Sequence, residues 1–304
     1  MKKLLGIALA SAAAGLCLSA LKKASDEQTV ELSPVKRSSP NKKAILVVSF
    51  GTSYAQTREK TIGAIEEDFR SAFPEYTIRR AFTSKMIIKK LRERDGIEVD
   101  TVAQALEKLE AEGYSTVICQ PTHVMGGFEF DDVKREVENW KGRFDHIACG
   151  WPLLTSSEDY EQVTEALVQE FSDIPSNAAL VLMGHGTEHP ANATYPALDY
   201  RLKACGCKNF FVGTVEGYPD LQTVMQEVAA IHASKVFLAP LMVVAGDHAI
   251  NDLCGEEEDS WKSCFEQAGY QTEPILKGLG EYPAFRRIYL EHCVQCIQSL
   301  ESEQ

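Results

Sequence analysis

The chain has 304 residues, of which 44% are apolar and 25% are charged, so it is long enough for about two domains and can bury a core without disulfides. Residues 42–304 carry 25 Lys and Arg against 41 Asp and Glu, a net charge of −16, which excludes general binding of nucleic acid or anionic lipid. An anionic small molecule would need a local basic pocket or a cluster of backbone amides.

Residues 1–20 have the pattern of a secretory signal peptide, with Lys2 and Lys3 ahead of an apolar run that ends in small residues. The run is shorter than the ~20 residues that a membrane-spanning helix prefers, so we expect no stable membrane insertion once it is removed. An uncleaved anchor is the alternative. Residues 21–41 are expected to be a flexible linker, and the expected localisation is periplasmic.

Beyond the linker, apolar β-branched runs alternate with amphipathic stretches, which predicts mainly parallel sheets covered by helices on both faces. A helix over residues 57–73 would place Ile62, Ile65 and Phe69 on one face. Another, over residues 156–171, would begin with a capping box. The expected capping-box residues are Thr155 and Glu158. The expected strands are residues 44–50, 77–81, 116–121, 146–149, 179–183, 209–215, 235–243 and 272–275.

Two pairs of similar segments predict an internal duplication. PTHVMGGFEFDDV (121–133) aligns at constant offset with PLMVVAGDHAIND (240–252), so that Glu129 stands where the second copy has His248. The strands ILVVSFGTS and LVLMGHGTE both end in x-Gly-Thr and align Phe50 with His185. We therefore expect two similar doubly wound α/β halves with the active-site cleft between them. The expected bounds are residues 42–155 and 156–304, with the helix over 156–171 joining or crossing them.

Ligands of parallel α/β sheets bind beyond the carboxyl ends of the strands. Four ionisable residues are expected at such ends: Glu129, His185, Glu216 and His248. Two imidazoles and two carboxylates form a plausible site for Co, Ni, Fe or Zn rather than Mg. Taken singly, each residue is better explained by a structural role, but their shared placement favours a metal site. His185 is the strongest candidate, because its flanking glycines are expected to leave space for a ligand.

The segment from His185 to His189 also matches the H-x-x-E-H pattern of some zinc peptidases. That pattern requires a helix, whereas Gly186 and Pro190 favour a loop, so peptidase activity is the weaker alternative. The turns Gly51-Thr52-Ser53 and Gly186-Thr187 could present amides and hydroxyls to substrate carboxylates. No nucleotide-binding motif occurs, and no nucleotide is expected.

The basic stretch over residues 85–94 predicts an amphipathic helix whose charged face is either solvated or available to an acidic substrate. The cysteines beyond the leader include Cys205-x-Cys207 and Cys293-x-x-Cys296, without a second CxxC for a zinc site. Most of them are expected to be small buried side chains.

Taken together, these segments closely resemble the anaerobic cobalt chelatase family, CbiK, of the class II chelatases. The resemblance covers residues 43–300, and GDHAIND and TSKMIIKKLR are its most specific strings. The matching segments are LVVSFGTSY (46–54), RAFTSKMIIKKLRERDGIEVDT (80–101), MGHGTEHP (183–190), VEGYP (215–219), PLMVVAGDHAINDL (240–253), DSWK (259–262) and GLGEYPA (278–284).

The resemblance implies insertion of Co²⁺ into sirohydrochlorin without ATP, a step of anaerobic cobalamin biosynthesis. It also implies that His185 is a metal-binding general base, that Glu216 and His248 are further metal ligands, and that Glu129 is another active-site acid. A neutral imidazole can accept one of the two pyrrole protons that the metal displaces. A mixed His/Glu set with an open position can hold an ion that must later leave.

The leader departs from the usual cytoplasmic member of this family and resembles the family's periplasmic branch, some members of which are associated with haem. Iron and nickel therefore stay open as the metal, and a haem has no ligand that can be assigned. The alternative function is a periplasmic haem-, tetrapyrrole- or metal-binding protein on a chelatase scaffold. A homo-oligomer is left open.

Overall fold

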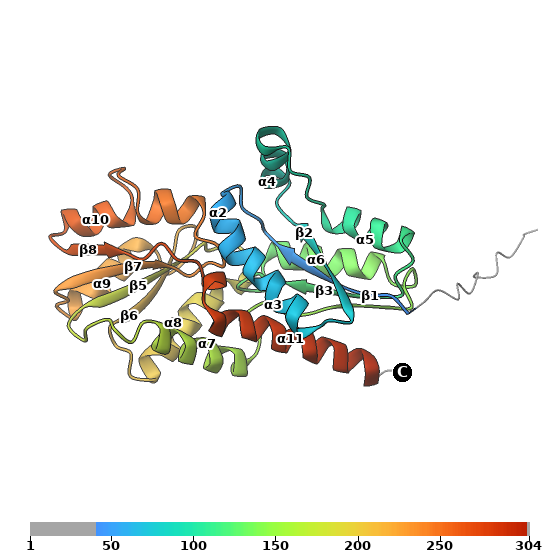
Figure 1. The fold of residues 1–304 in the computed structure, drawn as a ribbon. Coiled ribbons are helices and arrows are strands. Elements are labelled where there is room, and N and C mark those ends of the chain that lie inside the picture. Colours follow the sequence, from blue (N-terminus) through green and yellow to red (C-terminus); the bar gives the residue numbers. More distant parts are fainter. Residues whose placement is uncertain (1–40, 303–304) are drawn as a thin grey trace, which may run out of the picture. The chain divides into compact units, whose positions relative to one another are not determined.

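The structure of the protein is a computed structural model that describes residues 41–302 (Figure 1). The expected signal peptide and all but the last residue of the expected linker lie outside the described residues. Within residues 41–302, no helix combines the length and the apolar character needed to cross a membrane.

Within residues 41–302, eight strands form two four-stranded parallel sheets, and each expected strand overlaps one of them. The first sheet has the order β2-β1-β3-β4 and the second the order β6-β5-β7-β8, so the two topologies are identical. The strands are β1 (Lys43–Ser49), β2 (Tyr76–Phe82), β3 (Thr116–Pro121), β4 (His146–Cys149), β5 (Ala179–Gly184), β6 (Phe210–Thr214), β7 (Lys235–Pro240) and β8 (Gln271–Pro274). The predicted fold class is confirmed.

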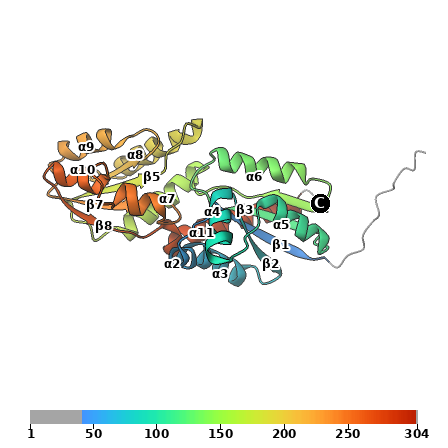
Figure 2. The same ribbon diagram turned by 90° about the horizontal axis from the view of Figure 1, so that it is seen from above.

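Helices connect the strands and cover both faces of each sheet (Figures 1 and 2). The α-helices are α2 (Ala55–Arg58), α3 (Ala64–Ala72), α4 (Lys85–Lys90), α5 (Val102–Ala111), α6 (Phe128–Asn139), α7 (Ser157–Glu170), α8 (Thr194–Ala204), α9 (Leu221–Ala230), α10 (Trp261–Gln267) and α11 (Pro283–Ser302). The π- and 3₁₀-helical segments are η1 (Glu59–Gly63), η2 (Leu91–Asp95), η3 (Pro190–Ala193), η4 (Ala249–Leu253) and η5 (Leu279–Glu281).

Successive strand residues point to opposite faces, which explains why the strands read as continuous apolar runs. Ile45 and Val47 of β1 pack with α3 and α11, whereas Leu46 and Val48 pack with α5 and α6. The second sheet lies in the same way between α7 and α8 on one face and α9 and α10 on the other. Each half is therefore doubly wound.

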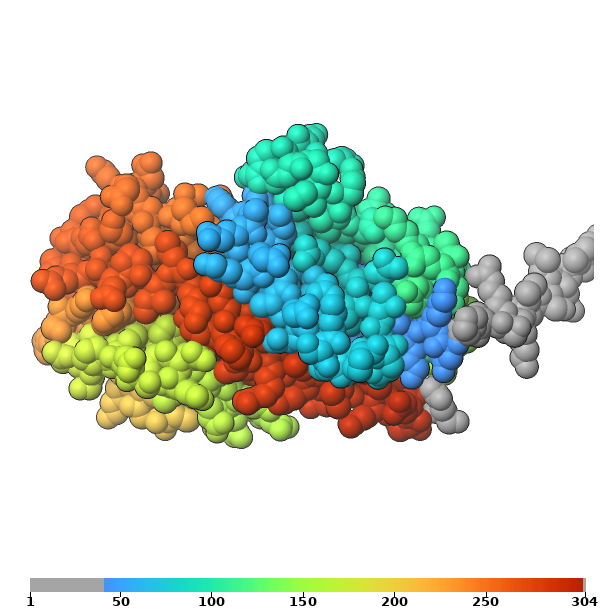
Figure 3. Space-filling view, in the orientation of Figure 1, coloured from blue at the N-terminus to red at the C-terminus, as the bar shows by residue number. Residues whose placement is uncertain are grey.

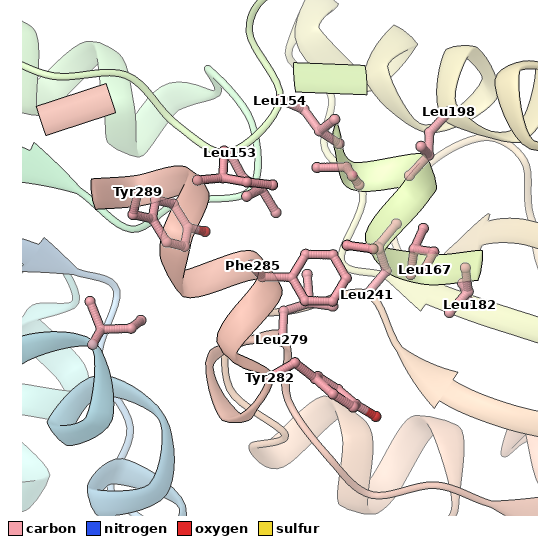
Figure 4. Close-up of a cluster of buried hydrophobic side chains, with 14 of the residues drawn as sticks. Leu153, Leu154, Leu167, Leu182, Leu198, Leu241, Leu279, Tyr282, Phe285 and Tyr289 are labelled. Carbon is pink, nitrogen blue, oxygen red and sulfur yellow. The ribbon is translucent and has the colours of Figure 1, made fainter. Parts of the chain in front are cut away.

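One hydrophobic core joins the two halves, because it contains residues of both sheets, such as Ile45 and Leu182. Figure 4 shows Phe285 and Tyr289 of α11 among leucines from both halves. The Tyr289 hydroxyl donates to the carbonyl of Thr122, which directly follows β3, at 2.9 Å. This core holds the carboxyl edges of the two sheets within one compact unit.

Helix α11 is the last helix of the described chain but packs against β3 and β4 of the first sheet and against α3. Figure 3 shows the surface of the C-terminal segment (red) beside that of the N-terminal half (cyan). Arg286 donates from Nε to Asp68 Oδ2 of α3 at 2.6 Å. The expected boundary between the two halves, at residues 155 and 156, stays a prediction. It divides the chain in sequence order, whereas α11, which follows the boundary, packs against the first half.

Equivalent backbone hydrogen bonds show the duplication in detail. The amide of Asp131 donates to Gly127 O at 3.0 Å, and the amide of Ile250 donates to Gly246 O at the same distance. Each bond closes the first helical turn after its glycine. Glu129 and His248 therefore occupy structurally equivalent positions in the two halves.

The capping box of α7 is one residue further along than predicted. Ser156 is the N-cap, its Oγ accepts from the amide of Asp159 at 3.2 Å, and Asp159 Oδ2 accepts from the Ser156 amide at 2.6 Å. The pairing of Thr155 with Glu158 is wrong because the Thr155 hydroxyl instead donates to Pro152 O at 3.1 Å.

Candidate metal site

Three of the four predicted ionisable residues lie together at the carboxyl edge of the second sheet. His185 directly follows β5, Glu216 lies two residues after β6, and His248 lies in the first turn of the helical segment that leads into η4. His185 Nδ1 is 3.8 Å from Glu216 Oε2, and the rings of His185 and His248 have centroids 4.5 Å apart at 88°. The topology thus brings residues 63 positions apart in the chain into one cluster.

The hydrogen bonds of His185 determine which ring nitrogen is free. Its Nδ1 is 2.9 Å from the carbonyl oxygen of Gly186, which can only accept, so Nδ1 carries the proton. Nε2 then has an unshared electron pair in the neutral ring. His185 can therefore present Nε2 either to a metal ion or to a proton.

His248 is oriented in the same way by a carboxylate that the sequence did not single out. Asp252 Oδ2 lies 2.5 Å from His248 Nδ1, one helical turn further along. A carboxylate on one imidazole nitrogen fixes the ring and raises the basicity of the other nitrogen, an arrangement typical of metal-binding histidines. The four-residue spacing between His248 and Asp252 was the available signal.

The three side chains form an open cluster rather than a closed cage. The side chains of His185, Glu216 and His248 are 45%, 61% and 36% exposed. Among residues 41–302, no three His, Cys, Asp or Glu side chains are already placed to hold one ion. Capture of an ion would therefore require these exposed side chains to turn toward it, which suits a metal that is bound only transiently.

Glu129 is not part of this cluster. It is the second residue of α6 and is exposed, and within the described chain it has no hydrogen bond or ion pair with the three other residues. Its neighbours nevertheless touch the second half: the ring of Phe128 is 4.8 Å from that of His189, edge to face, and Asp131 Oδ2 is 3.3 Å from His189 Nε2. These contacts bring the start of α6 to the loop that follows β5.

The glycines beside His185 do not leave space for a ligand, contrary to the prediction. A Cβ on Gly184 would lie 2.2 Å from the ring of Tyr195. Gly186 has φ +83°, and a Cβ there would lie 2.7 Å from the amide nitrogen of Gly217 and 2.8 Å from the carbonyl carbon of Glu216. The glycines are required because protein atoms pack against them, and Gly186 allows the loop that carries Glu216 to approach His185.

The two Gly-Thr turns differ in their free amides. The amides of Thr52 and Ser53 have no acceptor among the described residues, although both side chains are buried. By contrast, the amide of Gly186 donates to the Tyr195 hydroxyl at 3.4 Å and that of Thr187 to an Asn side chain at 3.1 Å. Binding of substrate through the amides of Gly186 and Thr187 is therefore not supported, whereas within the described residues the amides of Thr52 and Ser53 have no hydrogen-bond acceptor.

The turn at Gly51 also contacts the second half. The Tyr54 hydroxyl donates to Asp247 Oδ1 at 2.9 Å, and Asp247 directly precedes His248. This hydrogen bond raises the pKa of Tyr54, with burial and the charge of the carboxylate adding to it. Arg94 of η2 donates to the carbonyl of Ser53 and also pairs with Asp95.

The basic stretch over residues 85–94 forms α4 and η2, with Ile88 and Leu91 buried and most of its charged side chains at the surface. Residues 185–189 form a loop, as expected, so His185 and His189 do not share a helical face and the peptidase pattern is not formed.

A pocket of about 480 Å³ adjoins the site and is bordered by Asp252, Thr214 and Trp261.

The described cysteines only partly meet the expectation of burial. Cys119, Cys293 and Cys296 are buried, Cys205 is exposed, and the other four are partly buried. Burial raises the pKa of Cys254 to about 11, and because metals bind the thiolate, this group is a poor ligand at neutral pH.

Comparison with known proteins agrees with this geometry. A family model described as Cobalt chelatase (CbiK) matches residues 43–298. A sirohydrochlorin cobaltochelatase of Salmonella typhimurium is 44% identical over 264 residues, which cover 86% of this chain and 99% of the relative. The sirohydrochlorin cobaltochelatase CbiKC of Nitratidesulfovibrio vulgaris is 33% identical over 273 residues, covering 89% and 96% of the two chains.

Among solved structures, SirB from Bacillus subtilis with Fe³⁺ superposes with a TM-score of 0.58 at 14% identity and covers 86% of this chain and 98% of its own. At this identity the likeness concerns the fold.

Proposed function

Because the chain belongs to the cobalt chelatase (CbiK) family, we propose that it is a sirohydrochlorin cobaltochelatase, which inserts Co²⁺ into sirohydrochlorin without ATP. The observation that carries the proposal is the cluster of His185, Glu216 and His248 at one sheet edge, with the Nε2 atoms of both imidazoles free. A protein that only bound a tetrapyrrole would need neither a proton acceptor nor this set of metal ligands.

Insertion replaces two pyrrole protons with one divalent ion, so the site must both deliver the ion and accept protons. We assign acceptance of one of these protons to His185 Nε2, which becomes free when the ion leaves it, since its Nδ1 proton is held by Gly186 O. The second proton passes to the carboxylate of Glu216, which the ion also vacates, or to solvent. Glu216 and His248 hold the ion with His185 before transfer, and Asp252 keeps Nε2 of His248 directed outward. The exposure of these side chains favours release, because few protein contacts must break when the ion leaves.

The macrocycle carries many carboxylates, whereas residues 42–304 have a net charge of −16. Local donors must therefore offset a repulsive field. The free amides of Thr52 and Ser53 and the cationic Arg94 beside them are the groups that we assign to this role. Glu129, exposed at the start of α6, remains our candidate for a second active-site acid.

Cobalt is the proposed metal; iron and nickel suit the same donor set, and a haem ligand is not assigned. We further propose export to the periplasm, based on the sequence of residues 1–20, which precede the family match at residue 43. Recovery of the expressed protein from the periplasm with its N-terminus near residue 21 would support export, whereas an intact Met1 on cytoplasmic protein would contradict it.

The proposed function is tested by adding Co²⁺ and sirohydrochlorin to purified protein and following the visible spectrum, with Fe²⁺ and Ni²⁺ in parallel. We expect His185→Ala to lower the rate by about 10²–10⁴-fold while the circular dichroism is unchanged. His232→Ala is the matched control, since His232 is exposed and lies after α9 at the opposite edge of the sheet. A wild-type rate equal to the uncatalysed rate would refute the function, and an active His185 variant would refute its role as base.

A further inference from the structure

The loops that carry His185 and Glu216 are joined by one side chain, that of Asn192 in η3. Its Oδ1 accepts a hydrogen bond from the amide of Thr187 at 3.1 Å, two residues after His185. Its Nδ2 donates to the carbonyl oxygen of Tyr218 at 2.7 Å, two residues after Glu216. Because one partner can only donate and the other can only accept, the two bonds also fix the orientation of the amide.

The packing around Asn192 leaves little freedom in this connection. A Cβ on Gly217 would lie 2.5 Å from Asn192 Oδ1, so the amide rests directly against the segment between Glu216 and Tyr218. Two consecutive backbone bonds join the loops where β5 and β6 end, from the Val215 amide to Gly184 O at 3.1 Å and from the Glu216 amide to His185 O at 2.8 Å. Within the described residues, no backbone hydrogen bond joins residues 186–188 to residues 217–219, so beyond His185 and Glu216 the two loops are hydrogen-bonded to each other through Asn192.

The segment that presents Asn192 is itself well defined. The amide of His189 donates to Thr187 Oγ1 at 3.1 Å, and His189 Nδ1 accepts from the amide of Ala191 at 3.0 Å. Pro190 begins η3 with a backbone angle suited to a helical turn. The position of Asn192 therefore follows from the fold and does not depend on a bound ligand.

We propose that Asn192 is a positioning residue that sets the separation of His185 and Glu216 and so the affinity of the site for the divalent ion. The inference rests on the proposed function, since it takes these two residues as metal ligands. The side chains of His185 and Glu216 are 45% and 61% exposed, so the positions of their backbones set much of their separation. Residues that orient metal ligands typically contribute 10–100-fold to metal affinity or activity when mutated.

The test compares Asn192→Ala with Asn192→Leu, which keeps the bulk of the side chain but removes both hydrogen bonds. Asn209→Ala is the matched control, because Asn209 Nδ2 also bridges to backbone, donating to Ala178 O at 2.8 Å, but at the opposite edge of the same sheet. Calorimetric titration with Co²⁺ in the absence of macrocycle is the first measurement, and steady-state kinetics with each substrate varied is the second.

We expect both Asn192 variants to weaken Co²⁺ binding by about 10–100-fold and to raise KM for Co²⁺ with KM for sirohydrochlorin unchanged. Asn209→Ala should change neither. Unchanged Co²⁺ affinity in either folded Asn192 variant overturns the inference, as does an equal rise in both KM values. Wild-type protein that binds Co²⁺ but inserts none would count against the proposed function and leave the metal-binding result to be judged separately.

Discussion

The buried pair of His292 and Asp159 provides a quantitative test of how the C-terminal helix is held. His292 of α11 is 3% exposed and Asp159 of α7 is 6% exposed, and His292 Nε2 lies 2.8 Å from Asp159 Oδ1. His292 Nδ1 lies 3.1 Å from the carbonyl oxygen of Trp151, which can only accept. Both ring nitrogens therefore lie beside oxygen atoms that accept hydrogen bonds, and His292 links α11 to α7 through the Asp159 carboxylate.

Removal of the imidazole leaves a buried carboxylate without its side-chain partner. Asp159 Oδ2 keeps two backbone donors, the amides of Thr155 and Ser156 at 2.9 and 2.6 Å, but Oδ1 loses its only donor. Breaking one side of a buried pair typically costs 3–5 kcal/mol, so we expect His292→Ala to lower the free energy of unfolding by about 3–5 kcal/mol at pH 7. Asp159→Asn should cost less, about 1–2 kcal/mol, because it removes the buried negative charge and keeps a polar side chain beside His292.

The assay is urea unfolding followed by circular dichroism, with the double variant completing a mutant cycle. Arg287→Ala is the control in the same helix, since the Arg287 side chain is 72% exposed and its pair with Glu291 at 3.6 Å should contribute at most about 0.5 kcal/mol. A loss below 1 kcal/mol for His292→Ala, or costs that simply add in the double variant, would refute the coupling of this buried pair.

The same pair predicts a pH dependence. Burial disfavours the charged form of Asp159, but hydrogen bonds from His292 and from the backbone at Ser156 and Thr155 outweigh it and lower the pKa of Asp159. A carboxyl whose pKa is lower in the folded than in the unfolded state stabilises the fold above the unfolded value, and this contribution is lost as the pH falls through the folded value. The difference between wild type and His292→Ala should therefore shrink below about pH 4. A difference that stayed constant down to the acid transition would contradict this.

Two further predictions concern the site. Gly186→Ala should lower kcat/KM for insertion at least 10-fold and destabilise the protein by about 1–3 kcal/mol, because φ is +83° and the new Cβ would displace the backbone of Glu216 and Gly217; unchanged kinetics would contradict this. Asp252→Asn should weaken Co²⁺ binding about 10–100-fold in calorimetry without changing the unfolding midpoint, since Asp252 is exposed and acts through His248; an equal loss for Glu256→Gln, its exposed acidic control, would contradict this.

The strands and the duplication could be predicted because each depends on local sequence. A strand buried on both faces needs a continuous apolar run, as in β1 and β5, and helices between the runs require parallel pairing. The constant offset that aligned Glu129 with His248 corresponds to equivalent hydrogen bonds at Gly127 and Gly246. The predicted carboxyl ends of the strands then indicated the approximate positions of three candidate metal ligands.

The remaining features depend on contacts between residues that are far apart in the sequence, which local spacing cannot predict. Asn192 and Tyr54 act through partners 26 and 193 positions away, so no local pattern could identify them. The sequence shows glycines at positions 184 and 186. Whether a ligand or the ring of Tyr195 fills the space beside Gly184 depends on tertiary packing. The periodicity of α11 indicates a helix but not which of two similar sheets it covers.

The two halves use one backbone framework for different chemistry. The amide of Glu216 donates to His185 O at 2.8 Å, and at the equivalent place in the first half the amide of Ser84 donates to Phe50 O at 3.2 Å. Ser84 Oγ accepts from the amide of Ile87 as the N-cap of α4, so it is engaged in structure rather than available as a ligand. At these two positions, the proposed metal ligands therefore occur in the second half alone.

This asymmetry bears on how a planar macrocycle and a cation can share one site. Phe50 presents a phenyl ring that is 46% exposed, which cannot bind a cation as a ligand but can contact an apolar macrocycle face. His185, at the matching position, presents an unshared electron pair and cannot offer such a surface. If both halves carried imidazoles, an ion held between them would be enclosed by donors and would leave slowly. With donors on one side only, the proposed reaction has an open coordination face from which the ion can pass to the ring nitrogens, and Glu129 is the one ionisable group retained at an equivalent position opposite.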